Sequence, residues 1–183
     1  KGIEVHVWLN PYRYASSSDT YGKNHEKDYH NTHLDWLVDC GGITILNPAL
    51  PEVREQICKV VADIVENYDI DGVIFDDYFH QDGYKDAYDD VQYNAYKDTA
   101  SSVMSRADWR RAQNNLMIRM VNDTIKAVKP WVKFGIGPAG VAGKANTSAP
   151  VYGVEPCPTP ASDWQYNQIY ADPLAWYNEK TID

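Results

Sequence analysis

The feature that most constrains the fold is a repeated alternation of strand and helix patterns. Strand patterns lie at residues 3–9, 72–78 and 132–136. Helical patterns, with apolar residues at three- and four-residue steps, lie at 52–68, 105–128 and 164–180. The last of these is broken at Asp172-Pro173, where Asp172 can cap a new helical start. Strands that alternate with helices form parallel sheets covered by helices, so the order β-α-β-α-β-α predicts a single α/β domain over residues 1–183.

The connections differ in length at the two ends of the predicted strands. The helix-to-strand returns are short, at about residues 69–71 and 129–131. The strand-to-helix exits are long, at about 10–50, 79–104 and 137–162. Loops of this length are usually functional, and parallel α/β folds bind their ligands at the carboxyl ends of the strands. We therefore expect the functional site at that end of the sheet.

Two adjacent carboxylates, Asp76 and Asp77, close the second strand pattern. Successive side chains of a strand point to opposite faces, so only one of the two can face the site. Val73 and Phe75 suit packing against helices, and this parity leaves Asp76 on the other face. Carboxylates at strand ends commonly act in catalysis in such folds, although one can equally cap the loop while the other pairs with an arginine. Adjacent aspartates diverge, so a second catalytic carboxylate has to come from elsewhere in the chain.

Polar and aromatic side chains gather around the same strand ends. The first strand pattern has an apolar face and a second face of Glu4, His6, Trp8 and Asn10, which suits a strand that lines a lumen. Amphipathic rings and hydrogen-bonding groups together suit a sugar or another polyol, whereas an Asn-Pro turn with an exposed arginine is the purely structural interpretation of residues 10–13. The candidate ligand-binding residues are His6, Trp8, Asn10, Tyr12, Arg13, Tyr78 and His80.

Charge and motif content narrow the classes of partner. The net charge of −9 and the pI near 4.9 disfavour nucleic acid and anionic membrane surfaces, and no apolar run is long enough for membrane insertion. The chain has no dinucleotide, Walker or nucleophile-elbow motif, which predicts no cofactor. His25, His30 and His33 share one loop, but their spacing matches no strong metal motif, so we predict no metal.

Several runs of the sequence resemble, in the same order, the glycosyl-hydrolase-like family 10 domain. They are Ile3-Glu-Val-His-Val-Trp-Leu-Asn-Pro-Tyr-Arg13, Leu46-Asn-Pro48, Tyr68-Asp-Ile-Asp-Gly-Val-Ile-Phe-Asp-Asp-Tyr-Phe79, Asp108-Trp-Arg-Arg111, Lys133-Phe-Gly-Ile-Gly-Pro138 and Ile169-Tyr-Ala-Asp172. The resemblance implies a TIM-barrel carbohydrate-active domain, typically secreted or attached to the bacterial envelope, with some members acting on peptidoglycan glycan strands. A closed barrel has eight βα units in about 250 residues, so we expect a partial TIM barrel of about three βα units with long loops at the carboxyl face of the strands.

These observations lead to one main hypothesis and two alternatives. The main hypothesis is a glycoside hydrolase-like domain that acts on a bacterial or dietary polysaccharide or a peptidoglycan glycan strand, with Asp76 as nucleophile or transition-state stabiliser and Asp77 as its electrostatic partner. The alternatives are a non-catalytic carbohydrate-binding barrel and a metal-dependent hydrolase that uses Asp76, Asp77 and His80. The full-length protein is the expected glycosidase. The segment alone is expected to be inactive and to self-associate, or to pack loop segments, at its open sheet edges.

Overall fold

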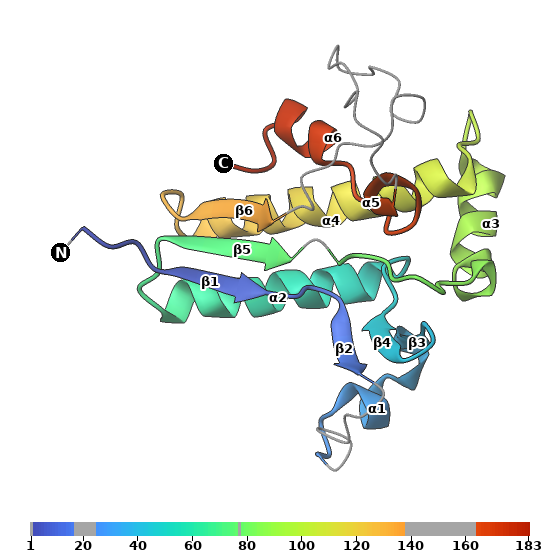
Figure 1. The fold of residues 1–183 in the computed structure, drawn as a ribbon, viewed down its shortest axis with the longest axis horizontal. Helices are drawn as coiled ribbons and strands as arrows, with labels where there is room; N and C mark the ends of the chain where they lie inside the picture. The colour runs from blue at the N-terminus through green and yellow to red at the C-terminus, as the bar shows by residue number, and fades with distance from the viewer. Residues whose placement is uncertain (1, 17–24, 77, 138–163) are drawn as a thin grey trace.

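A three-stranded parallel sheet forms the centre of the molecule. The computed structural model describes residues 2–16, 25–76, 78–137 and 164–183 (Figure 1). The sheet has the order β1-β5-β6, with both neighbouring pairs parallel, and its strands are β1 (His6–Leu9), β5 (Gly72–Asp76) and β6 (Lys133–Gly137). The predicted α/β alternation and its three parallel strands are therefore confirmed.

Two long helices cover one face of the sheet and pack against each other. They are α2 (Pro51–Asn67) and α4 (Arg106–Val128). Proline suits the first turn of α2, and the Ser105 hydroxyl caps α4 by accepting a hydrogen bond from the backbone N–H of Asp108 at 3.1 Å. The apolar stripes of both helices meet the sheet side chains Val73, Phe75 and Phe134 in one buried core. The burial of this apolar surface is the main force that holds the layers together.

The opposite face of the sheet carries the polar and aromatic side chains of β1. On this face Trp8 pairs with Ile74 of β5 and leaves 63% of its surface exposed. No layer of helices covers this face in Figure 1, as far as the described residues go. The inward face of a barrel strand has this character, because the barrel wall and not a helix layer encloses it.

The first long loop contains a small second sheet that the sequence patterns did not predict. Its order is β2-β4-β3, all antiparallel, and its strands are β2 (Arg13–Ser16), β3 (Leu37–Asp39) and β4 (Ile43–Leu46). The short helices α1 (Tyr29–Thr32) and η1 (Leu34–Trp36) precede β3. Strands of three or four residues lie at or below the shortest run, about four residues, in which alternation is recognisable, and this is why the pattern was missed.

The remaining elements lie in the second long loop and in the last helical pattern, 164–180. They are η2 (Asp86–Tyr88), α3 (Asp90–Thr99), α5 (Trp164–Asn167) and α6 (Pro173–Asn178). The predicted break at Asp172-Pro173 is confirmed, since the Asp172 carboxylate accepts a hydrogen bond from the Ala175 N–H at 3.1 Å. The C-terminal Asp183 pairs with Phe134 at the outer edge of β6 through two hydrogen bonds, Asp183 N–H to Phe134 O and Phe134 N–H to Asp183 Oδ2. Within the described residues, no helix combines the length and the apolar character needed to cross a bilayer.

Candidate functional site

Asp76 is the last residue of β5 and lies at the carboxyl end of the parallel sheet. It pairs with Gly137, the last residue of β6. Val73 and Phe75, which share the other face of β5, are completely buried against the helices. This confirms the predicted packing and leaves Asp76 on the face that carries Ile74 and Trp8. Asp77 lies outside the described residues.

The indole ring of Trp8 extends along the same face toward Asp76. A Cβ placed on Gly137 would lie 3.6 Å from Cη2 of Trp8, so the ring runs from β1 across to the end of β6. A Cβ at that distance would only be in van der Waals contact with the ring, and the large exposed fraction of Trp8 leaves its surface open to a ligand. The exposed Trp8 ring therefore lies beside Gly137, the residue that pairs with Asp76.

Three further predicted residues meet just beyond the strand ends. The Arg13 guanidinium lies 5.3 Å from the centre of the Tyr78 ring, and the Arg13 N–H donates to Asn10 Oδ1 at 3.1 Å. The Tyr78 ring contacts Trp164 at a centroid distance of 5.9 Å. Trp164 was not predicted, because only the tertiary fold brings the start of the last helical pattern to the end of β5. Together these residues present cationic, amide and aromatic groups on one edge of the sheet.

His6 does not belong to this group. It begins β1 and pairs with Gly72, so it lies at the amino end of the sheet, four strand positions or about 13 Å before the level of Asn10. The His6 ring hydrogen-bonds Glu4 at 3.0 Å, and Glu4 also accepts from Lys133 at 2.8 Å. The structure therefore places His6 apart from the other candidates, since a strand places its two ends far apart, and the predicted role of His6 in substrate binding stays a prediction.

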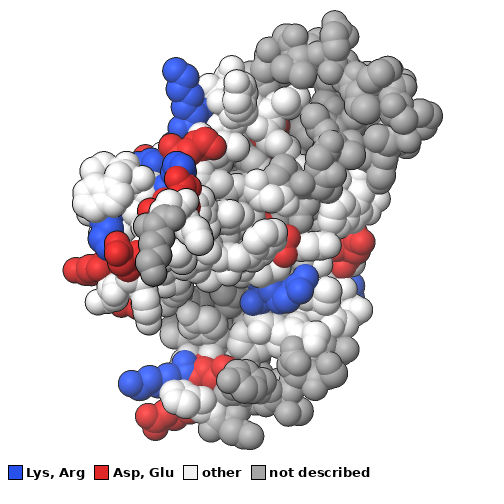
Figure 2. Space-filling model, turned by 60° about the vertical axis from the view of Figure 1, so that its left-hand side comes forward, with Lys and Arg blue, Asp and Glu red and all other residues white. Residues whose placement is uncertain are grey.

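The surface turned toward the viewer in Figure 2 has a mixed charge pattern. Blue and red side chains lie intermingled among the described residues, and white surface separates them. Separately from this view, the ion pair between Glu4 and Lys133 joins opposite charges at 2.8 Å. A broad basic field, which a phosphate backbone requires, is not formed by the described residues of this view.

Tyr12 and His80 are corrected as direct ligand contacts, because both side chains are buried. Tyr12 has no exposed surface and packs edge-on against Phe79, and this burial raises the pKa of its hydroxyl well above the usual value. His80 is 1% exposed and lies edge-on to Tyr84 and Tyr170. Burial, with a smaller contribution from the charge of Arg110, holds the pKa of His80 well below its ordinary value, so its ring is neutral. Both residues support the site from inside the fold.

A buried ionic network holds the second loop, and Tyr170 in the segment between α5 and α6, against α4. The Arg110 guanidinium donates to both carboxylate oxygens of Asp89, at 2.6 Å and 2.9 Å, and to the Tyr170 hydroxyl at 2.9 Å. Asp89 is fully buried and also pairs with Arg106 at 2.7 Å. Charged groups that are buried and fully paired fix the geometry of the segments that carry them. No local pattern indicates these pairings, because their partners lie 17 to 60 positions apart.

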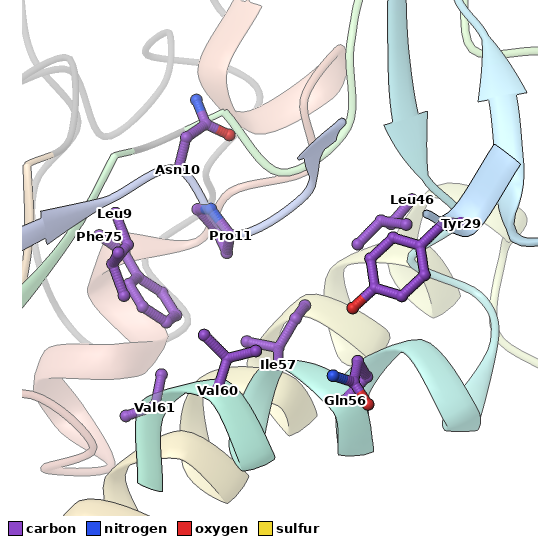
Figure 3. A pocket seen from close by; sticks show the side chains of 10 residues that line it. All are labelled: Leu9, Asn10, Pro11, Tyr29, Leu46, Gln56, Ile57, Val60, Val61 and Phe75. Atoms are coloured by element: carbon purple, nitrogen blue, oxygen red, sulfur yellow. The ribbon is translucent and has the colours of Figure 1, made fainter. Parts of the chain in front are cut away.

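An apolar groove lies on the other side of the sheet, between β1 and α2. It has a volume of about 160 Å³, and Figure 3 shows Leu9 and Phe75 facing the helix residues Ile57, Val60 and Val61 across it. The labelled Asn10 side chain points away from α2 in this view. A groove lined mainly by aliphatic side chains offers few hydrogen bonds to a polar ligand, so it is a packing surface and not the candidate site.

The described residues do not form a metal-binding site. Within residues 2–16, 25–76, 78–137 and 164–183, no three His, Cys, Asp or Glu side chains lie together as metal ligands. The alternative of a metal-dependent hydrolase also required Asp77, which lies outside these ranges.

Comparison with known proteins agrees with this architecture. The chain is 38% identical, over all of its length, to glycosyl hydrolase YngK of Bacillus subtilis (strain 168), of which it covers 35%. It is 32% identical to glycosyl hydrolase DigH of Escherichia coli (strain K12), of which it covers 42%. The solved structure of α-L-fucosidase isoenzyme 2 from Paenibacillus thiaminolyticus superposes on 80% of this chain and 22% of its own, with a TM-score of 0.52 and 16% identity, which supports the fold alone.

The fold identifies the class of protein to which this chain belongs. Three parallel βα units with long loops at the carboxyl ends of their strands form part of a TIM barrel, and the chain is a glycoside hydrolase-like domain. The family model for glycosyl hydrolase-like 10 matches residues 1–183, and the chain belongs to that family. It spans well under half the length of the two curated relatives described above.

Proposed function

We propose that this chain forms part of a glycosidase that hydrolyses a polysaccharide or a peptidoglycan glycan strand, with Asp76 as the nucleophile or transition-state stabiliser. The observation that carries the proposal is the position of Asp76 at the carboxyl end of β5, on the face where the Trp8 ring lies open. Glycoside hydrolysis requires carboxylates at the scissile bond, and TIM barrels place catalytic groups at this end of their strands. An extracytoplasmic location is proposed on the family resemblance alone.

The surrounding side chains suit a sugar chain. Trp8 offers a flat apolar surface on which the C–H face of a sugar ring can stack, and Arg13 and Asn10 supply hydrogen-bonding groups next to Tyr78. Within the proposed mechanism, Asp76 stabilises the positive charge that develops on the sugar ring as the leaving oxygen departs. Asp77 acts as its electrostatic partner. The general acid that protonates the leaving oxygen is a second carboxylate, supplied elsewhere in the complete barrel.

The test is Asp76→Asn, made in the complete barrel. This change removes the charge and keeps the side-chain volume, so the fold and most of the glycan affinity should persist while kcat falls by at least about 100-fold. Asp69→Asn, an exposed aspartate in the return before β5, is the matched control and should leave kcat unchanged. Turnover of purified glycan strands and polysaccharides is measured by release of reducing ends.

Each outcome decides between the hypotheses. A variant that keeps a tenth or more of the wild-type kcat removes Asp76 from the mechanism. Glycan binding by the wild-type barrel without any product favours the non-catalytic carbohydrate-binding barrel.

A further inference from the structure

A second, polar pocket lies beyond the carboxyl ends of the strands. Its volume is about 260 Å³, near the lower end of the range of ligand pockets, which is roughly 300–1,000 Å³. It lies between the loop that follows β5 and the segment that joins α5 to α6, and both of these lie past the tips of the strand arrows in Figure 1. The lining residues that matter here are Gln81, Asp82, Tyr84, Asn167, Gln168 and Tyr170.

We propose that this pocket is a second sugar subsite, which holds a neutral sugar unit of the same glycan some distance along the chain from the bond at Asp76. The inference rests on the proposed function. It adds the location at which the distal part of the substrate binds and the kind of sugar that binds there.

Direct contacts connect the pocket to the first site. Tyr78, two residues after Asp76, contacts the ring of Trp164, and the Trp164 indole N–H donates to Asp82 Oδ1 at 2.9 Å. Asp82 is part of the pocket wall. One pair of aromatic rings therefore separates the two sites, so an oligosaccharide can extend from Asp76 across Tyr78 and Trp164 into the pocket.

The pocket wall contains a buried donor that has no partner in the described part of the chain. Gln81 is only 7% exposed, and its Nε2 has no hydrogen-bond partner among the described residues. A buried donor of this kind is unfavourable while it is unpaired, and it becomes favourable when a rotation of the Gln81 side chain lets it donate to a ligand oxygen in the pocket. Asn167 and Gln168 add two further amides to the wall. Side-chain amides both donate and accept, and this matches the hydroxyl groups of a sugar.

The aromatic part of the wall is fixed in advance. Arg110 lies against the rings of Tyr84 and Tyr170, at 5.0 Å and 5.2 Å, and the Tyr170 hydroxyl accepts from its guanidinium. Tyr170 has a φ of 54°, in the left-handed region that a residue other than glycine adopts at a cost in energy. Such conformations are frequent at ligand-binding positions. Rings that are already ordered lose little entropy when a ligand binds.

The charge of the wall favours a neutral sugar over an acidic one. Asp82 contributes a carboxylate, and no lysine or arginine is among the described residues that line the pocket. The chain as a whole carries a net charge of −9. An anionic sugar would enter this negative environment without a cationic partner.

The experiment measures oligosaccharide affinity by calorimetry in the complete barrel with Asp76→Asn, which prevents turnover. The neutral probes are cellobiose, cellohexaose, chitobiose and chitohexaose, and oligogalacturonate is the acidic probe. Gln81→Leu removes the amide at similar volume, and the Gln81 Nε2 has no hydrogen bond to another described residue. Gln168→Ala, at an exposed wall position, gives an independent variant, and Gln92→Leu on α3 is the matched control.

We expect Gln81→Leu and Gln168→Ala each to weaken the binding of at least one hexasaccharide about tenfold and to leave the affinity for the disaccharides unchanged. The control, Gln92→Leu, should change neither affinity. Unchanged hexasaccharide affinity in both folded variants overturns the subsite and leaves the proposed function standing. Tighter binding of oligogalacturonate than of either neutral hexasaccharide overturns the assignment to a neutral sugar. No binding of any probe counts against the proposed function itself and removes the subsite with it.

Discussion

At the scale of single residues, exposure separates the side chains that can meet a ligand from those that support the fold. Trp8 and Tyr12 are neighbours in sequence and similar in chemistry, yet Trp8 is 63% exposed and Tyr12 is fully buried. Tyr12→Ala would therefore empty a core position at a cost of about 3–5 kcal/mol and would report on folding, not on binding. Trp8 is the informative position.

We predict that Trp8→Ala in the complete barrel lowers oligosaccharide affinity about tenfold, because it removes the stacking surface beside Asp76. The free energy of unfolding should change little, since the ring is mostly in solvent. Trp131→Ala is the matched control, because Trp131 is 70% exposed and lies just before β6, at the amino end of the sheet. Calorimetric titration measures both variants, and equal affinities for Trp8→Ala and wild type would place the glycan elsewhere.

His80 gives the chain a dependence of stability on pH. Its pKa is depressed in the folded state and about 6.5 in the unfolded state, so the unfolded chain binds the extra proton as the pH falls. The stability due to neutral His80 is therefore complete above about pH 6.5 and is lost below it, by about 1.4 kcal/mol per pH unit until the folded pKa is reached.

Urea denaturation between about pH 7.5 and pH 5.5 measures this loss. His80→Phe keeps a ring against Tyr84 and Tyr170 and removes the titration, so its unfolding free energy should fall less steeply with acid. His30→Gln, at an exposed position of α1, should retain the wild-type slope. Parallel slopes in wild type and His80→Phe would show that His80 takes up no proton on unfolding.

At the scale of elements, the long loops are ordered by contacts between them. Tyr84 in the second loop donates its hydroxyl hydrogen to Asn47 Oδ1 at 2.7 Å, and the Asn47 side-chain amide donates to Tyr88 O at 2.8 Å. Asn47 follows β4 of the small antiparallel sheet. The first loop is thereby fixed to the second, and the ionic pair of Arg110 and Asp89 fixes the second to α4. The loop face is built from paired, buried polar groups, and these specify one arrangement.

Gly83 shows how closely the loops approach each other. Its φ is +84°, and a Cβ there would lie 2.9 Å from the backbone oxygen of Cys40. Gly41 has a similar φ of +79°, but no described heavy atom lies within 4 Å of its Cβ position. We predict that Gly41→Ala costs about 1–2 kcal/mol of unfolding free energy, the conformational cost alone.

Gly83→Ala should cost about 1–3 kcal/mol more than Gly41→Ala, because the two loops must also move apart. Thermal or urea denaturation of both variants measures the difference. Equal costs would mean that the loops separate without resistance.

At the scale of the whole molecule, the parallel sheet has two edges. Asp183, which follows α6 and belongs to none of the long loops, covers part of the β6 edge through its hydrogen bonds to Phe134. Near the β1 edge, Ile3 and Val5 are 83% and 54% exposed, and Val60 of the neighbouring groove is 44% exposed. An apolar edge strand is a template for pairing with another chain.

We predict that the isolated chain of 183 residues self-associates through this edge. Sedimentation velocity over a wide range of concentration should detect the dimer, and Val5→Lys should shift the chain toward monomer. Tyr177→Lys, at an exposed position of α6, should not. A chain that is monomeric at every concentration would contradict the prediction, and efficient glycan hydrolysis by that monomer would contradict the incomplete barrel as well.

Local patterns in the sequence were enough to determine the parallel α/β order, the bounds of the long helices to within a few residues, and the side of β5 on which Asp76 lies. Hydrophobic periodicity, the Ser105 cap and strand parity are properties of neighbouring residues, so the sequence displays them directly. Only the tertiary structure decided which candidates meet. It separated His6 from Asp76 by the length of a strand, buried Tyr12 and His80, and brought Trp164 to Tyr78. Burial and contacts between distant segments depend on how the layers pack, and this is information that no short stretch of sequence contains.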